Sequence, residues 1–176
     1  MGGNVATMNE RDSAPGGLAL VEALVNTLDI ETGADSLDTA EGRAPFALAE
    51  PDLPAARALR EALRAACLAH AGHCSDDSPL CVLDRLLAEA PLRVTVDAAG
   101  VAALRPVQEP PGLMARIAAA VAAAAADGTW ARLKACEAAD CRWAYYDRSP
   151  AGRRRWCSMS VCGARAKMRT YRARRG

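Results

Sequence analysis

Residues 136–167 read CEAADCRWAYYDRSPAGRRRWCSMSVCGARAK, and this stretch holds four of the seven cysteines of the 176-residue chain. They form two Cys-x4-Cys pairs, Cys136 with Cys141 and Cys157 with Cys162, separated by fifteen residues. Two close pairs at such a separation are typical of a zinc site, because each pair lies on a tight turn that presents two thiolates to one ion. Four cysteines leave no open coordination position, so the sequence predicts one structural Zn²⁺ ion.

The cysteines lie in the most basic part of the chain. Residues 136–176 carry eleven Lys or Arg against three Asp or Glu, whereas the whole chain has a net charge of +1. This positive segment indicates a polyanionic partner. It is too poor in aliphatic residues to form a core of its own, so we expect bound zinc to provide its folding free energy. The residues expected to pack around this module are Trp143, Tyr145, Trp156, Met168 and Tyr171.

A basic helix is expected to follow the second cysteine pair, over residues 163–175. Arg165, Arg169 and Arg172 recur at the spacing of one helical face. Arginines on such a helix can contact phosphates and guanine edges in the major groove of double-stranded DNA. The residues expected to contact DNA, on this helix and in the loop before it, are Arg153, Arg154, Arg155, Arg165, Lys167, Arg169 and Arg172.

Two other kinds of partner remain open for the basic module. Aromatic residues interleaved with arginines also suit stacking on single-stranded RNA. The module could instead be a protein-interaction adaptor that docks on an acidic partner, including the acidic remainder of this chain. An enzyme is not expected, because no acid–base pair, activated nucleophile or open metal position is visible.

The rest of the chain is predicted to be mainly α-helical with one β-hairpin, an α+β class. Apolar residues recur at helical spacing over 18–28, 55–71 and 78–90, and an alanine-rich helix is expected over 113–126. In the second of these helices the charged residues, Arg60 and Arg64 among them, lie away from the apolar face. Alternation of apolar and polar residues predicts a half-buried hairpin near 92–107.

The change in composition predicts two domains, a helical one over 17–134 and a zinc module over 135–176. Residues 1–16 are expected to form a flexible tail without the features of a signal peptide. No apolar run reaches the ~18–20 residues that span a membrane. We therefore expect the protein in the cytoplasm, where thiols stay reduced.

A second group of potential ligands, Cys67, His70 and Cys74, is spaced along one face of a continuous helix. It would form a second metal site. The alternative is a helix end with a buried Cys67 and solvated histidines. Cys81 is expected to be a core residue.

The stretch from Cys136 to Lys167 resembles the CGNR zinc finger. The resemblance rests on the two cysteine pairs and on the runs CRWAYYD, RRWCSM and CGARAK. Ala164 stands where the family motif has Asn, so a helix-start or DNA contact made by that Asn is missing here. The resemblance implies a small hairpin followed by a helix, in a treble-clef-like zinc module.

Proteins with this finger usually carry an N-terminal ABATE domain, and residues 24–29, LVNTLD, resemble the Leu-x-Asn-Thr signature that opens it. The order of the predicted helices and hairpin fits that domain. The resemblance implies a bacterial, zinc-dependent DNA-binding transcription regulator linked to stress responses, whose helical domain senses a small-molecule effector or forms a homodimer. Asn26 is then a candidate ligand-binding residue, although an Asn here equally suits a cap or a core hydrogen bond.

Overall fold

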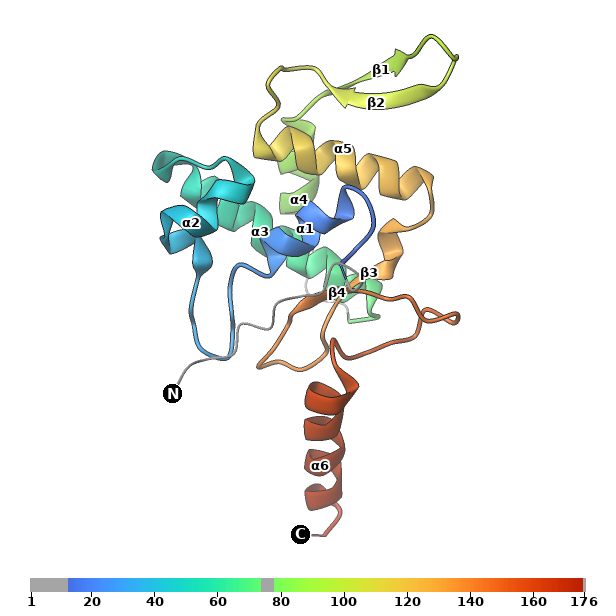
Figure 1. The fold of residues 1–176 in the computed structure, drawn as a ribbon. Coiled ribbons are helices and arrows are strands. Elements are labelled where there is room, and N and C mark those ends of the chain that lie inside the picture. The colour runs from blue at the N-terminus through green and yellow to red at the C-terminus, as the bar shows by residue number, and fades with distance from the viewer. Residues whose placement is uncertain (1–12, 74–77, 176) are drawn as a thin grey trace.

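The computed structural model describes residues 13–73 and 78–175. Helices form most of it, two small antiparallel hairpins lie apart from each other, and the last helix points away from the rest of the molecule (Figure 1). The mainly α class with hairpins is therefore confirmed. None of the described helices combines the length and apolar character needed to cross a membrane. The main elements are α1 (Leu18–Val25), α2 (Ala40–Arg43), α3 (Leu53–His70), α4 (Ser78–Ala88), β1 (Leu92–Val96), β2 (Ala102–Pro106), α5 (Leu113–Ala126), β3 (Leu133–Ala135), β4 (Ala144–Tyr146) and α6 (Ala164–Ala173).

The connection between α1 and α3 contains short helical turns, which the sequence does not predict. Side-chain caps define these turns: Asp35 accepts a hydrogen bond from the Leu37 N–H at 3.0 Å, and Thr39 accepts one from the Gly42 N–H at 3.1 Å. A Cβ atom on Gly42 would lie 1.9 Å from the Ser36 carbonyl oxygen, so only glycine fits there. Caps of this kind act over two or three residues and produce no apolar periodicity. The helical spacing of apolar residues therefore could not reveal the turns.

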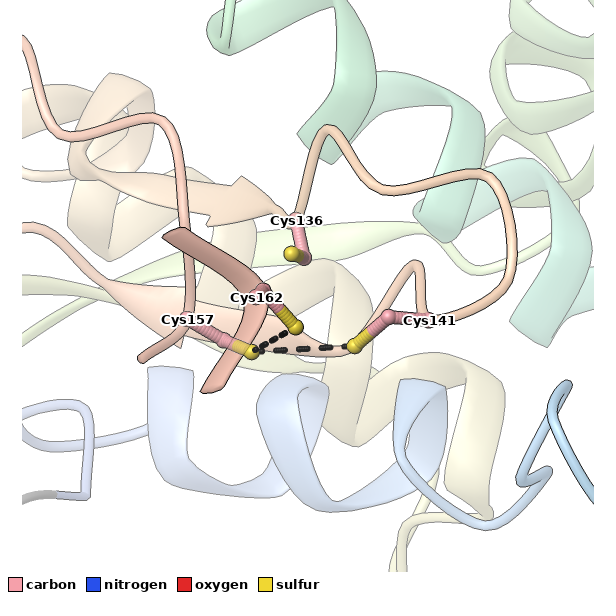
Figure 2. A group of neighbouring side chains, drawn as sticks. All are labelled: Cys136, Cys141, Cys157 and Cys162. Carbon is pink, nitrogen blue, oxygen red and sulfur yellow. Dashed lines mark hydrogen bonds between the residues drawn. The ribbon is translucent and has the colours of Figure 1, made fainter. Parts of the chain in front are cut away.

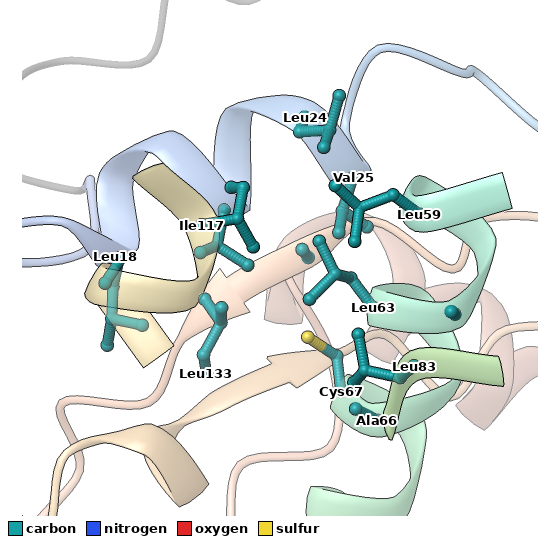
Figure 3. Packing of buried hydrophobic residues seen from close by; sticks show 14 of the residues in the cluster. Leu18, Leu24, Val25, Leu59, Leu63, Ala66, Cys67, Leu83, Ile117 and Leu133 are labelled. Atoms are coloured by element: carbon teal, nitrogen blue, oxygen red, sulfur yellow. The ribbon is translucent and has the colours of Figure 1, made fainter. Parts of the chain in front are cut away.

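The hydrophobic core is built by α1, α3 and α5 and continues into the second hairpin. Leu133 of β3 is fully buried in the same cluster as Leu63, Cys67 and Ile117 (Figure 3). Ala144 of β4 belongs to that cluster as well. The core thus extends across the expected boundary at residues 134–135, and the hairpin that leads to the cysteines is packed against the helices.

The end of the expected flexible tail is attached to the helical domain. Residues 1–12 lie outside the described part of the chain, but Ala14 is buried, and its N–H donates to the Glu22 carboxylate at 2.7 Å. The Ser13 carbonyl accepts a hydrogen bond from Arg148 at 2.6 Å. Residues 13–16 therefore belong to the folded part of the protein.

The first hairpin lies where the alternating pattern predicts it, but its apolar face is exposed. β1 and β2 are joined by a turn in which Gly100 has a φ of 80°, a value that favours glycine. Val94 and Val96 are 70% and 65% exposed, whereas Thr95 and Ala103 on the other face are partly buried. The prediction of a half-buried strand is therefore wrong, because no residue of β1 or β2 is buried and the partly buried ones, which include Leu92 and Thr95, come from both faces.

Candidate metal centre

The four cysteines predicted to bind zinc come together in space. Their Sγ atoms all lie within 4.8 Å of one another, and those of Cys141 and Cys162 lie 3.6 and 3.7 Å from that of Cys157 (Figure 2). Four sulfurs placed ~2.3 Å from one ion at the corners of a tetrahedron are ~3.8 Å apart. The spacing is far longer than the ~2.05 Å bond of a disulfide. The cluster therefore fits one structural zinc ion.

Two backbone turns present the thiols. Cys136 follows β3, and its N–H donates to the Trp143 carbonyl at 2.9 Å, which closes the hairpin behind the first pair. The Cys141 N–H donates to Ala138 at 3.0 Å. The second pair begins in a loop and ends in the helical turn Met159–Gly163 that leads directly into α6. The order of a small hairpin followed by a helix, which the resemblance implies, is present.

The helix start is capped without the Asn that the family motif contains. Ala164 is the first residue of α6 and offers no side-chain acceptor. In the preceding turn the Ser158 hydroxyl accepts a hydrogen bond from the Val161 N–H at 3.3 Å. Gly163 packs closely, since a Cβ there would lie 3.1 Å from the Met159 sulfur and 3.3 Å from the Trp156 ring. Ser158 thus caps the turn before α6, and Gly163 allows Met159 and Trp156 to pack closely at the start of the helix.

Hydrogen bonds among the cysteine side chains shift their pKa values in opposite directions. Hydrogen bonds from the thiols of Cys141 and Cys157 lower the pKa of Cys136 to about 2, and the same contact raises the pKa of Cys141 to about 12. Hydrogen bonds to Cys136 and Cys141 likewise raise the pKa of Cys157. The thiols of Cys141 and Cys157 thus donate hydrogen bonds to the Cys136 thiolate. Zinc replaces the protons, so its affinity is expected to fall as the pH falls.

A buried ion pair supports the module beneath the cysteines. Asp147 is fully buried and accepts hydrogen bonds from the Lys134 ammonium at 3.0 Å, from the Ser149 N–H and hydroxyl at 3.0 and 2.6 Å, and from the Arg154 N–H at 2.9 Å. Burial alone would raise the pKa of Asp147, but the hydrogen bonds from Ser149 and Lys134 lower it to about 2. The loop that returns to Cys157 is therefore organised around one carboxylate.

Three side chains of the helical domain attach it to the metal module. The Asn26 amide forms two hydrogen bonds with the Ala144 peptide, donating to its carbonyl at 2.9 Å and accepting from its N–H at 2.7 Å. Arg64 donates to the Arg142 carbonyl at 3.0 Å, beside the first cysteine pair. The His70 Nδ1–H donates to the Leu133 carbonyl at 2.8 Å. These contacts hold the second hairpin by its backbone.

The structure gives Asn26 a positioning role, and its expected contact with an effector stays a prediction. Both polar atoms of its amide form a hydrogen bond with Ala144, and each keeps the capacity for one further hydrogen bond. This corresponds to the core hydrogen bond that the sequence left open. Asn26, the Asn of the signature, thus links the end of α1 to β4.

Replacement of Asn26 by alanine is expected to destabilise the zinc-loaded protein by about 2 kcal/mol, because the Ala144 N–H and carbonyl lose their partner at a partly buried site. Urea unfolding would measure this change in the free energy of unfolding. Asn26→Asp is the matched variant, since it keeps the acceptor for the N–H and loses the donor to the carbonyl. An Asn26→Ala protein as stable as the parent would contradict the positioning role.

The second group of potential ligands is only partly described. Cys74 lies outside the described residues, so a site that includes it is not tested. Cys67 is fully buried, and burial raises the pKa of its thiol to about 12. His70 is not solvated as expected, because it bonds to Leu133 and its ring meets that of Trp130 edge-on at 4.9 Å. Cys81, expected in the core, is exposed on α4.

The basic residues of α6 are all exposed, and none of the residues of this helix is buried. Two of them meet acidic groups at the base of the helix. Arg165 lies 3.1 Å from both carboxylate oxygens of Glu31 in the helical domain, and Arg169 lies 3.8 Å from Asp140. Such exposed ion pairs stabilise a fold little and exchange readily with other anions. The remaining basic residues of this helix are Lys167 and Arg172.

The three arginines of the preceding loop have different environments. Arg153 is exposed. The guanidinium of Arg154 donates to the carbonyls of residues 156–157, so this side chain acts within the module. Arg155 forms a two-pronged ion pair with Glu137 and remains largely exposed. Among these three arginines expected to contact DNA, Arg154 therefore already uses its guanidinium to bind the backbone of the module.

The aromatic residues divide between the module and the solvent. Tyr145 is buried, its hydroxyl donates to the Arg154 carbonyl, and Trp156 packs against the cysteine cluster, as expected. Met168 and Tyr171, also expected to pack on the module, are 52% and 50% exposed. That expectation is wrong, because α6 points away from the module (Figure 1), and the Tyr171 ring instead packs against the Arg175 guanidinium, 4.6 Å from the ring centroid.

Comparisons with known proteins agree with this architecture. Residues 18–128 match the ABATE family, described as "putative stress-induced transcription regulator", and residues 132–175 match the CGNR zinc finger. No curated protein matches the chain. The first match covers the helical part and the first hairpin, and the second covers the four cysteines and α6. The chain therefore belongs to the ABATE family and carries a CGNR zinc finger over residues 132–175.

Proposed function

We propose that the protein is a zinc-dependent DNA-binding transcription regulator that acts in the cytoplasm and uses α6 to contact double-stranded DNA. The observation that carries this proposal is the exposure of α6. None of its ten residues is buried, and four of them are basic. An α-helix of this kind fits the major groove of B-form DNA. The zinc ion has a structural role, because its four cysteine ligands leave no position for a substrate.

The residues proposed to contact DNA are those whose cationic groups can leave their present partners. Glu31 and Asp140 hold Arg165 and Arg169 only at the surface, so phosphates can replace these carboxylates. Arg154 is left out, since its guanidinium is occupied by backbone carbonyls. The proposed contacts are Arg153, Arg155, Arg165, Lys167, Arg169 and Arg172.

Selection from a random duplex DNA pool tests this proposal directly. The zinc-loaded full chain should retain duplexes at physiological salt and enrich a sequence motif. Competition with single-stranded RNA at matched salt separates the DNA-binding function from an RNA-binding one. Retention of neither nucleic acid, with co-purification of an acidic protein, would support an adaptor and contradict the proposal.

Replacement of Arg169 by alanine is expected to weaken duplex binding about tenfold and to reduce the salt dependence by about one counterion. Binding titrations at several salt concentrations measure both quantities. The control is Arg93→Ala, which removes the same charge from the exposed hairpin β1–β2, far from α6 (Figure 1). Equal effects of the two substitutions would indicate that net charge alone, and no site on α6, controls binding.

A further inference from the structure

One face of α6 and of the turn Met159–Gly163 before it carries apolar side chains that no described residue covers. Val161, Ala164 and Met168 follow one another at i, i+3 and i+7, and Val161 and Met168 are 48% and 52% exposed. Three arginines flank them along the same open groove of about 500 Å³. We call these residues the recognition face: Val161, Ala164, Arg165, Met168, Arg169 and Arg172.

We propose that the recognition face selects thymine-containing DNA through the thymine methyl groups. This inference rests on the proposed function of α6. The C5-methyl group of thymine is the apolar group that base pairs present in the major groove. Val161 and Met168 would contact methyl groups there, while the flanking arginines contact phosphates and guanine edges.

Charge argues for a polyanion as the occupant of this face. A second copy of the helix would bring its own three arginines against these three, and like charges at an interface oppose association. The apolar stripe is also only one side chain wide, with arginines directly beside it. Helices that lie in a lipid surface have a broader apolar face. The major groove of DNA is complementary to this face. Phosphates line its edges, where they can pair with the arginines, and thymine methyl groups lie between them, where they can contact the apolar residues.

The expected size of the effect follows from the burial of a methyl group. Removing one buried methyl group should weaken binding about fourfold, the change that corresponds to one CH₂ unit transferred from water. Uracil differs from thymine only by this methyl group. A duplex with uracil keeps every phosphate, so its binding should show the same salt dependence.

The test compares the zinc-loaded full chain on two duplexes, alternating poly(dA-dT) and alternating poly(dA-dU). We expect the thymine duplex to bind at least about fourfold more tightly. Met168→Ala should remove most of this difference, and α6 should remain helical because alanine has the higher helix propensity. Val94→Ala, which shortens an exposed apolar residue on β1, should leave the difference unchanged.

Three results would overturn the inference. Equal affinity for the two duplexes, with Arg169→Ala still weakening both, would contradict methyl recognition and leave the proposed DNA binding intact. Absence of binding to either duplex would contradict both proposals. Binding to phosphatidylglycerol vesicles that Met168→Ala abolishes, without binding to duplexes, would assign the stripe to a lipid surface.

Discussion

Replacement of Cys157 by serine is expected to remove zinc from the protein and to unfold the chain from about residue 147 onwards, including α6. Cys157 is the sulfur that lies between Cys141 and Cys162 in the cluster, at 3.6 and 3.7 Å. Zinc binding contributes roughly 10–16 kcal/mol in comparable structural sites. Few apolar side chains in this segment are buried apart from the cysteine cluster, so no other interaction can replace that free energy.

The unfolding should stop at the second hairpin. β3 and β4 pack in the main core through Leu133 and Ala144, and Asn26, Arg64 and His70 hold their backbone. Hydrogen exchange followed by mass spectrometry can separate the two regions. Amides of 157–173 should lose protection in the variant, whereas those of 133–135 and 144–146 should keep most of theirs.

Cys81→Ser is the matched control, because Cys81 is an exposed cysteine on α4. It should retain one zinc ion per chain and unchanged exchange. Removing zinc from the parent protein with a chelator should reproduce the pattern of Cys157→Ser. A Cys157→Ser protein with a full zinc content and a protected α6 would show that the four-cysteine site does not hold the module together.

The sequence predicted the metal ligands and the long helices because both depend on local spacing. The cysteine pairs are defined by four-residue gaps, and α3 and α5 by apolar periodicity and alanine content. The helix α6 was also visible, since its arginines repeat at helical spacing. The prediction that Met168 and Tyr171 pack on the module was wrong, because a single sequence does not tell whether a helix face meets the protein or the solvent.

The attachment between the domains was invisible in the sequence. Arg60 and Arg64 belong to the charged side of an amphipathic helix, which ordinarily faces solvent, yet both are buried. Arg64 bonds to the carbonyls of Val25 and Arg142, the latter 78 residues away. Such long-range contacts have no local period.

The rigid link between the helical domain and the finger has a consequence for the proposed regulator. Asn26, at the end of α1, and Arg64, on α3, hold β4 and the first cysteine turn. Glu31, in the connection that follows α1, meets Arg165 at the base of α6. A change in the packing of α1 against α3 would therefore move contacts made by β4, by the first cysteine turn and by the base of α6.

Replacement of Asp147 by alanine is expected to cost about 3–5 kcal/mol of unfolding free energy, because it leaves the buried Lys134 ammonium without its counterion. Lys134 would keep only the Gly152 carbonyl as a partner, while the Ser149 and Arg154 N–H groups would lose their acceptor. Urea unfolding of the zinc-loaded protein near neutral pH measures the change. Since the pKa of Asp147 is about 2 in the folded protein, against an ordinary value of 3.8, its carboxylate is charged at the pH of this measurement.

Asp140→Ala is the matched control for this prediction, because it removes an exposed carboxylate from the same module. Its contacts with Arg165 and Arg169 are 4.0 and 3.8 Å long and lie at the surface, so the loss should be small. The loss of stability in Asp147→Asn should lie between those of Asp140→Ala and Asp147→Ala, since the amide keeps one acceptor for the neighbouring N–H groups but no charge for Lys134.

The stabilising contribution of Asp147 also depends on pH. It is full above pH about 4 and is lost as the pH falls through about 2, since the pKa of Asp147 is lower in the folded protein than in the unfolded chain. If Asp147→Ala cost no more than Asp140→Ala, the loop that returns to the second cysteine pair would owe its shape to zinc alone, and Lys134 would have to reach solvent in the variant.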